Sequence, residues 1–159
     1  MPSQTYFGQP TILAAGGTAR TTSSQTANLK DTANQIPASD AVAFILNVTA
    51  LSGAGAAVNL DVWIDTSWDG ATTWMTAYKF TRVTTSTATL RIDTRTNGKG
   101  LGEVGSQESV ITYTTGALNT NTVLAADQRV RWEIGGASSL GSATFGVFAL
   151  SIPPGARGL

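Results

Sequence analysis

The chain has 159 residues, of which ten are acidic, ten are basic and none is histidine or cysteine. Histidine and cysteine provide most of the acid–base, nucleophilic and transition-metal chemistry of proteins near neutral pH. Their absence excludes serine–histidine and cysteine nucleophiles. We therefore expect a structural or binding protein that is not an enzyme and has no cofactor.

The chain has few charged residues, and its acidic and basic residues are equal in number. Only 13% of the residues are charged, against about 25% in typical soluble domains. The lysines and arginines are scattered, so counterion release gives an isolated chain little affinity for nucleic acid. A net charge of zero leaves weak repulsion between copies, which favours self-association or docking on a larger assembly.

The beginning of the chain shows no targeting pattern. Residues 1–5 lack the basic segment and the apolar run of a secretory signal. No stretch approaches the roughly 20 apolar residues that cross a membrane. We therefore expect no signal peptide and no membrane partner.

Residues 1–39 differ in composition from the remainder of the chain. Their main apolar run is Thr11–Ala14, and it is followed by Gly16–Ser24, a stretch too small and polar to pack a core. We expect an extended N-terminal arm, either a free tail or a segment that orders on a neighbouring subunit. The residues that would anchor it on a partner are Tyr6, Phe7, Ile12 and Leu13.

From residue 40 onward, short strand patterns alternate with turn signals. The expected strands are 41–51, 58–65, 74–80, 87–93, 129–134 and 144–152. The strict alternation in 58–65 predicts an inward face that consists of Val58, Leu60, Val62 and Ile64. The same alternation in 74–80 predicts that one side of that strand carries Trp74, Thr76, Tyr78 and Phe80.

No helical period is sustained for three turns. Residues 40–159 therefore predict one all-β domain, an antiparallel β-sandwich of jelly-roll-like type with the extended arm attached to it. Residues 94–122 contain the turn-forming Asn97–Gly100 and a possible short strand at 110–113. We expect them to form a long excursion across the surface.

The turn after 58–65 resembles the opening of a calcium-binding loop. In Asp65–Gly70, oxygen-bearing side chains recur at alternate positions and a glycine follows. Thr76 stands where such a loop would supply its bidentate acid, so the motif is incomplete. We expect no metal site but a hairpin turn in which Asp69 caps its own backbone.

Asp61 and Asp65 share the outward face of 58–65, with Trp63 between them. Two carboxylates beside an aromatic ring are compatible with glycoside hydrolysis, and an exposed tryptophan is compatible with sugar stacking. The third interpretation, which we favour, is structural. One or both acids would pair with Arg129 or Arg131 on an adjacent strand, and Trp63 would lie under a guanidinium or in a subunit contact.

About two thirds of the chain, from Val42 to Ile152, resembles the small β-sandwich virion proteins of tailed bacteriophages, in particular the head decoration or cement proteins. The resemblance is carried by ILNVTALSGAGAAVNLDVWID, by SWDGATTW before Phe80, and by RVRWEIGGASS leading to ATFGVFALSI.

This resemblance implies a homotrimer without enzymatic activity that sits at three-fold and quasi-three-fold positions of the capsid and bridges neighbouring capsomers. Its partners would be the major capsid protein and further copies of itself. It would be made in the host cytoplasm and located on the exterior of the virion capsid.

The alternative is a carbohydrate- or receptor-binding module of a phage tail, a tail fibre or the capsid surface. Trp63 and Trp68 motivate it, because exposed aromatic rings can stack on sugars. The outward residues that we expect to bind a partner or a glycan are Trp63, Trp68, Arg129 and Arg131.

Overall fold

The computed structural model of the chain describes residues 10–31, 41–53, 58–95, 125–136 and 141–152. Its strands are β1 (Thr11–Ala14), β2 (Ala19–Arg20), β3 (Ser24–Gln25), β4 (Ala41–Ser52), β5 (Val58–Ser67), β6 (Met75–Lys79), β7 (Ala88–Arg95), β8 (Asp127–Gly136) and β9 (Ser142–Ile152), and one short 3-10 helix, η1, spans Leu29–Asp31. Most of the surface excursion expected at 94–122 lies outside the described residues.

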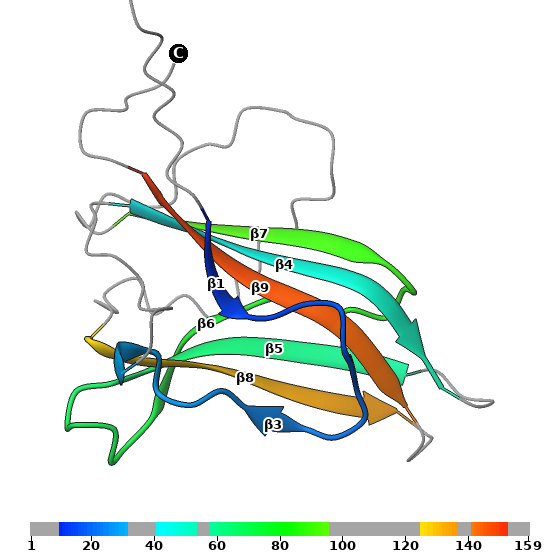
Figure 1. Cartoon of the computed structure of the whole chain (residues 1–159), viewed down its shortest axis with the longest axis horizontal. Coiled ribbons are helices and arrows are strands. Elements are labelled where there is room, and N and C mark those ends of the chain that lie inside the picture. Colours follow the sequence, from blue (N-terminus) through cyan, green and yellow to red (C-terminus); the bar gives the residue numbers. More distant parts are fainter. Residues whose placement is uncertain (1–9, 32–40, 54–57, 96–124, 137–140, 153–159) are drawn as a thin grey trace, which may run out of the picture.

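The strands form two antiparallel sheets that pack against each other, which confirms the all-β sandwich (Figure 1). One sheet has the order β1-β9-β4-β7, with β2 also paired to β9, and the other has the order β3-β8-β5-β6. No helix in the part of the chain that the structure describes is long and apolar enough to cross a membrane.

The core lies between the sheets because apolar residues occupy alternate positions of the long strands. The inward face predicted for 58–65 is confirmed, since Leu60, Val62 and Ile64 are fully buried and Val58 nearly so. The largest fully buried side chains that meet them include Phe44, Leu46, Phe80, Val130, Phe145 and Val147.

The single face predicted for 74–80 is wrong. A β-bulge at Ala77 separates Thr76 from Tyr78, because these two residues pair with consecutive positions of β5. Thr76 therefore faces outward, and its hydroxyl donates a hydrogen bond to Oδ1 of Asp65 at 3.2 Å. Tyr78, in contrast, packs inward against the core. Residue alternation predicts an unbroken strand, so it cannot reveal a bulge.

The N-terminal segment contributes strands to both sheets. β1 and β2 pair with β9 of the five-stranded sheet, and β3 pairs with β8 of the four-stranded sheet. Residues 11–25, which we call the strap, therefore cross from one sheet to the other along one side of the sandwich (Figure 1). The predicted boundary at residue 39 lies outside the described residues, as do residues 1–9.

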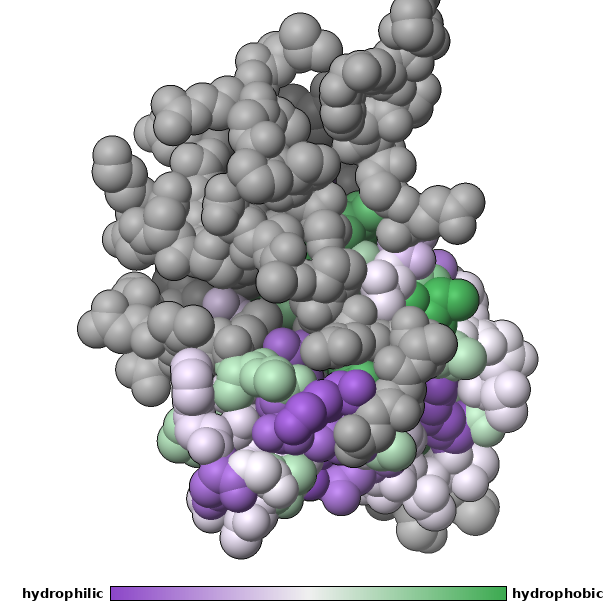
Figure 2. Space-filling view, turned by 60° about the vertical axis from the view of Figure 1, so that its left-hand side comes forward, coloured by the Kyte–Doolittle hydropathy of each residue, from purple (hydrophilic) through white to green (hydrophobic). Residues whose placement is uncertain are grey.

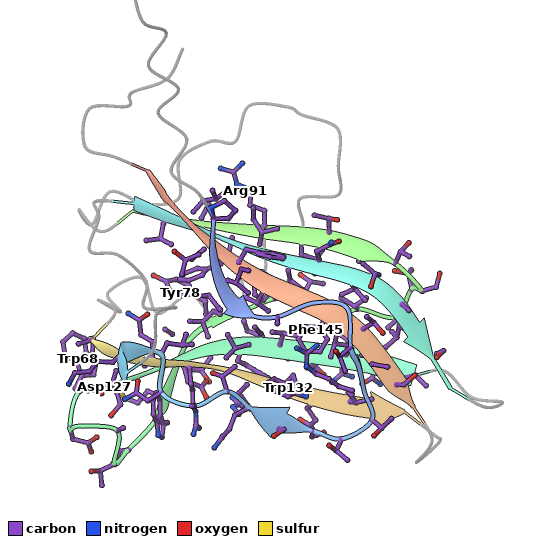
Figure 3. All side chains as sticks on the ribbon, in the orientation of Figure 1. Trp68, Tyr78, Arg91, Asp127, Trp132 and Phe145 are labelled. Carbon is purple, nitrogen blue, oxygen red and sulfur yellow. The ribbon has the colours of Figure 1, made fainter. Side chains whose placement is uncertain are left out.

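Arg20 of the strap contacts residues of both sheets. Its guanidinium donates hydrogen bonds to the carbonyl oxygens of Phe145 at 2.7 Å and Ala15 at 2.6 Å. It also lies 4.2 Å from the ring centroid of Phe145 and 5.1 Å from that of Trp132, and these two rings meet edge to face (Figure 3). Burial lowers the pKa of Arg20, but an arginine remains charged near neutral pH. One cation thus connects β2, β8 and β9.

The strap can be tested with two adjacent residues of β1. Leu13 is 2% exposed and belongs to the core, whereas Ile12 is 46% exposed. We expect Leu13→Ala to lower the free energy of unfolding by about 2–5 kcal/mol, the usual cost of a cavity in a core. Ile12→Ala, the control, should cost less than about 1 kcal/mol. Urea unfolding measures both, and an unchanged midpoint for Leu13→Ala would show that the strap does not pack as described.

Candidate functional site: the outer face of the four-stranded sheet

The register of three strands arranges charged and aromatic side chains in rows on the outer face of the four-stranded sheet. Trp63 of β5 lies opposite Arg131 of β8 on one side and Lys79 of β6 on the other. In the next row, Asp65 lies opposite Arg129 and Thr76. Side chains directly opposite each other on one face are close enough to interact, so these rows form one connected network.

Asp65 is held by two arginines. Its Oδ2 accepts hydrogen bonds from Nε of Arg131 at 2.9 Å and from Nε of Arg129 at 3.2 Å. Its Oδ1 accepts from the hydroxyl of Thr76. Although the residue points away from the core, it is only 2% exposed, because the two cations cover it. The predicted pairing of an outward acid with Arg129 or Arg131 is confirmed.

Asp61, also only 2% exposed, has different partners from those expected. Lys79 Nζ lies 3.0 Å from Oδ1, and Arg82 contacts Oδ2 through Nε at 2.9 Å and Nη2 at 2.7 Å. Burial acts to raise the pKa of Asp61, but the hydrogen bonds from Arg82 and Lys79 outweigh it and hold the pKa below the ordinary value. A glycosidase acid needs a raised pKa, so Asp61 is shifted in the direction opposite to that of a general acid.

The tryptophans of this face are covered by cations. The guanidinium of Arg131 lies 4.1 Å from the centroid of the Trp63 ring, and the Lys79 ammonium lies 5.1 Å from it. Arg129 lies 4.4 Å from the Trp74 ring. The prediction that Trp63 lies under a guanidinium is confirmed. Such cation–π contacts fix the side chains in place and leave less of the Trp63 ring for a sugar.

Sequence reasoning missed two residues of this network, Lys79 and Arg82, which were not singled out. It also placed Trp74 on the same side of its strand as Tyr78 and Phe80, whereas Trp74 contacts Arg129 on the outer face. The hairpin signal at Asp69-Gly70 indicates that the strand after it returns beside β5. The bulge in β6, however, shifts which residues lie opposite Trp63, so the pairing with Lys79 could not be read from residue spacing.

The hairpin between β5 and β6 is built on Asp69. Its Oδ1 accepts hydrogen bonds from the backbone N–H groups of Thr72 at 3.1 Å and Thr73 at 2.8 Å, and from the hydroxyl of Ser67 at 2.7 Å. These hydrogen bonds, of which the one from the Thr73 backbone has the largest effect, lower the pKa of Asp69 to about 2. The turn in which Asp69 caps its own backbone is confirmed. Within the described residues, no three side chains of the acidic, histidine or cysteine type gather as a metal site.

The remaining candidates occupy different places. Trp68 is 58% exposed where the hairpin begins, and Ile12 is exposed on the strap. Leu13 lies in the core of its own chain. Tyr6 and Phe7 lie outside the described residues. Of the six candidates that the structure describes, it therefore brings together Trp63, Arg129 and Arg131 only.

Comparison of the chain with protein-family models, with curated proteins and with solved structures found no match.

The pairing of Asp61 can be tested with an isosteric change. Asp61→Asn leaves Lys79 and Arg82 without their anion, so we expect the free energy of unfolding at neutral pH to fall by about 1–3 kcal/mol. Because the folded pKa lies below the ordinary 3.8, the ionised acid stabilises the fold above that pH, and this stabilisation is lost as the pH falls through the folded pKa. The variant should therefore lose less stability on acidification than the parent chain.

The matched control is Glu133→Gln, which removes an exposed acid directly opposite Asp61 on β8. We expect it to change stability by no more than about 0.5 kcal/mol. Urea unfolding at several pH values measures both variants. Equal effects of the two substitutions would contradict the special role of Asp61.

Proposed function

We propose that the chain is a structural virion protein, a decoration or cement protein that binds the outer surface of a phage head and bridges neighbouring coat subunits. Its partners would be the major capsid protein and two further copies of itself, in a trimer at three-fold and quasi-three-fold positions. Modest contacts repeated over many symmetric copies add to a large stabilisation through multivalency.

The observation that carries this proposal is that the two buried acids on the outer face of the four-stranded sheet are paired with cations. Asp61 and Asp65 each bind two cations, and a cation lies over the Trp63 ring. These side chains are paired with one another on one face of the sheet. Arginine and tryptophan are the residues that dominate the energetics of protein interfaces, so this surface suits contact with another protein.

Two further features support a contact role. The confirmed β-sandwich agrees with the fold of the decoration proteins that the sequence resembles. Large apolar side chains are exposed at separate places on the described part, namely Ile12 of the strap and Trp68 and Met75 at the base of the hairpin. Trp68 and Met75 offer apolar anchors at the end of the four-stranded sheet, and Ile12 offers one on the other sheet.

Cryo-electron microscopy of the particle that contains this chain tests the proposal. We expect density for the β-sandwich on the outside of the head, at the three-fold and quasi-three-fold positions, with contacts to more than one coat subunit. Density confined to the tail, or none on the virion, would refute the capsid function. A stable trimer in solution, measured by light scattering, would agree with the same assignment.

A second candidate function, glycan binding, is favoured by one observation. Trp68 is 58% exposed at a hairpin that Asp69 holds rigid, and an exposed indole on a rigid turn can stack on a sugar ring. If this function holds, a glycan array should show binding that Trp68→Ala abolishes. Trp63→Ala should leave it largely intact, because cations already cover that ring. An array without any signal would reject this candidate.

A further inference from the structure

The ion pairs of the described residues are asymmetric. In each of the five, the carboxylate is the more buried partner and the cation the more exposed one. The side chains of the cations are 15% to 56% exposed, whereas those of the carboxylates are 3% to 12% exposed. Negative charge therefore lies beneath positive charge on this side of the sandwich.

A chain with zero net charge thus presents a locally positive surface. The five cations, which we call the cationic face, are Lys30, Lys79, Arg82, Arg129 and Arg131. Among the described residues, three carboxylates lie under them, those of Asp61, Asp65 and Asp127. These eight groups carry a net charge of +2, which the exposed Glu133, an acid that acts electrostatically on Arg82, reduces to +1. Figure 2 shows strongly hydrophilic residues grouped among neutral and weakly hydrophobic ones on the side of the sandwich that it turns forward.

We propose that the cationic face is a protein-docking surface that receives a cluster of carboxylates on its partner. The identity of that partner as the coat subunit rests on the function proposed above. The charge argument itself is independent of that function, because it follows from which member of each ion pair reaches solvent.

The composition of the face favours a protein over a polyanion. Trp63 and Trp74 lie among the cations, each with a guanidinium stacked on its ring, and interfaces between proteins are enriched in these two residue types. One exposed acid, Glu133, lies opposite Asp61 on β8 and acts electrostatically on Arg82. It would repel the continuous charge of a nucleic acid, whereas a protein can place its carboxylates over the cations alone.

Two of the cations converge on one point of the face. Arg129 and Arg131 are alternate residues of β8, and their Nε atoms lie 3.2 and 2.9 Å from the same oxygen, Oδ2 of Asp65. Guanidinium groups bind carboxylates with defined geometry, so this pair gives orientation as well as attraction.

The test measures the affinity of the chain for purified heads that lack it, over a range of salt concentrations. We expect Lys30→Gln and Arg82→Gln each to weaken binding about two- to fivefold at low salt, the effect of one exposed charge pair. Added salt should reduce the difference. The control is Arg91→Gln, which removes an exposed charge from β7 on the other sheet (Figure 3) and should leave affinity unchanged.

The outcomes separate this inference from the function on which it rests. If the parent chain does not bind heads at all, the proposed function fails. If it binds and neither Lys30→Gln nor Arg82→Gln weakens binding more than Arg91→Gln, the function stands and the cationic face is refuted. Lys30 forms the longest of the five ion pairs, at 3.7 Å, so its substitution should disturb the fold least. Thermal melts check that each variant folds.

A second measurement uses a defined probe in place of the head. Labelled poly-L-glutamate should bind the parent chain more tightly than duplex DNA at equal ionic strength, and Lys30→Gln with Arg82→Gln should weaken that binding. Equal or tighter binding of DNA would overturn the assignment to an acidic protein partner.

Discussion

The register of β5 against β8 is the constraint on which both faces of the four-stranded sheet depend. Side chains alternate along a strand with a period of two, so a slip of one residue would exchange the two faces. In the observed register, Ile64 points into the core while Trp63 and Asp65 lie opposite Arg131 and Arg129. Burial of the apolar face fixes this register. The charged network on the outside is therefore positioned by the core beneath it.

Burying two outward carboxylates imposes a further requirement. A desolvated acid is unfavourable unless cations and hydrogen bonds compensate it, and Asp61 and Asp65 each have two cations that do so. Long basic side chains reach over the acids while their charged ends stay near solvent. The same arrangement that satisfies the acids therefore makes the surface positive.

The strap shows a similar dependence on distant parts of the chain. Its composition is that of a tail, since small and polar residues dominate Gly16–Ser24. The strap forms backbone hydrogen bonds to the edges of β8 and β9, and these do not require apolar side chains. Two of its side chains anchor it, since Leu13 enters the core and Arg20 contacts both sheets. A segment too polar to fold alone can thus be ordered by edges that another part of the sequence provides.

The sequence by itself determined the strands from β4 to β9, the inward face of 58–65, the turn at Asp69 and the pairing of an outward acid with an arginine of β8. These features depend on alternation and turn chemistry within short windows, which are visible in residue order. Only the tertiary structure decided the bulge at Ala77, the partners of Asp61, the path of the strap and the exposure of cations over buried acids. Each of these features depends on which strand edges meet and in what register. Contacts between residues far apart in the chain determine that pairing.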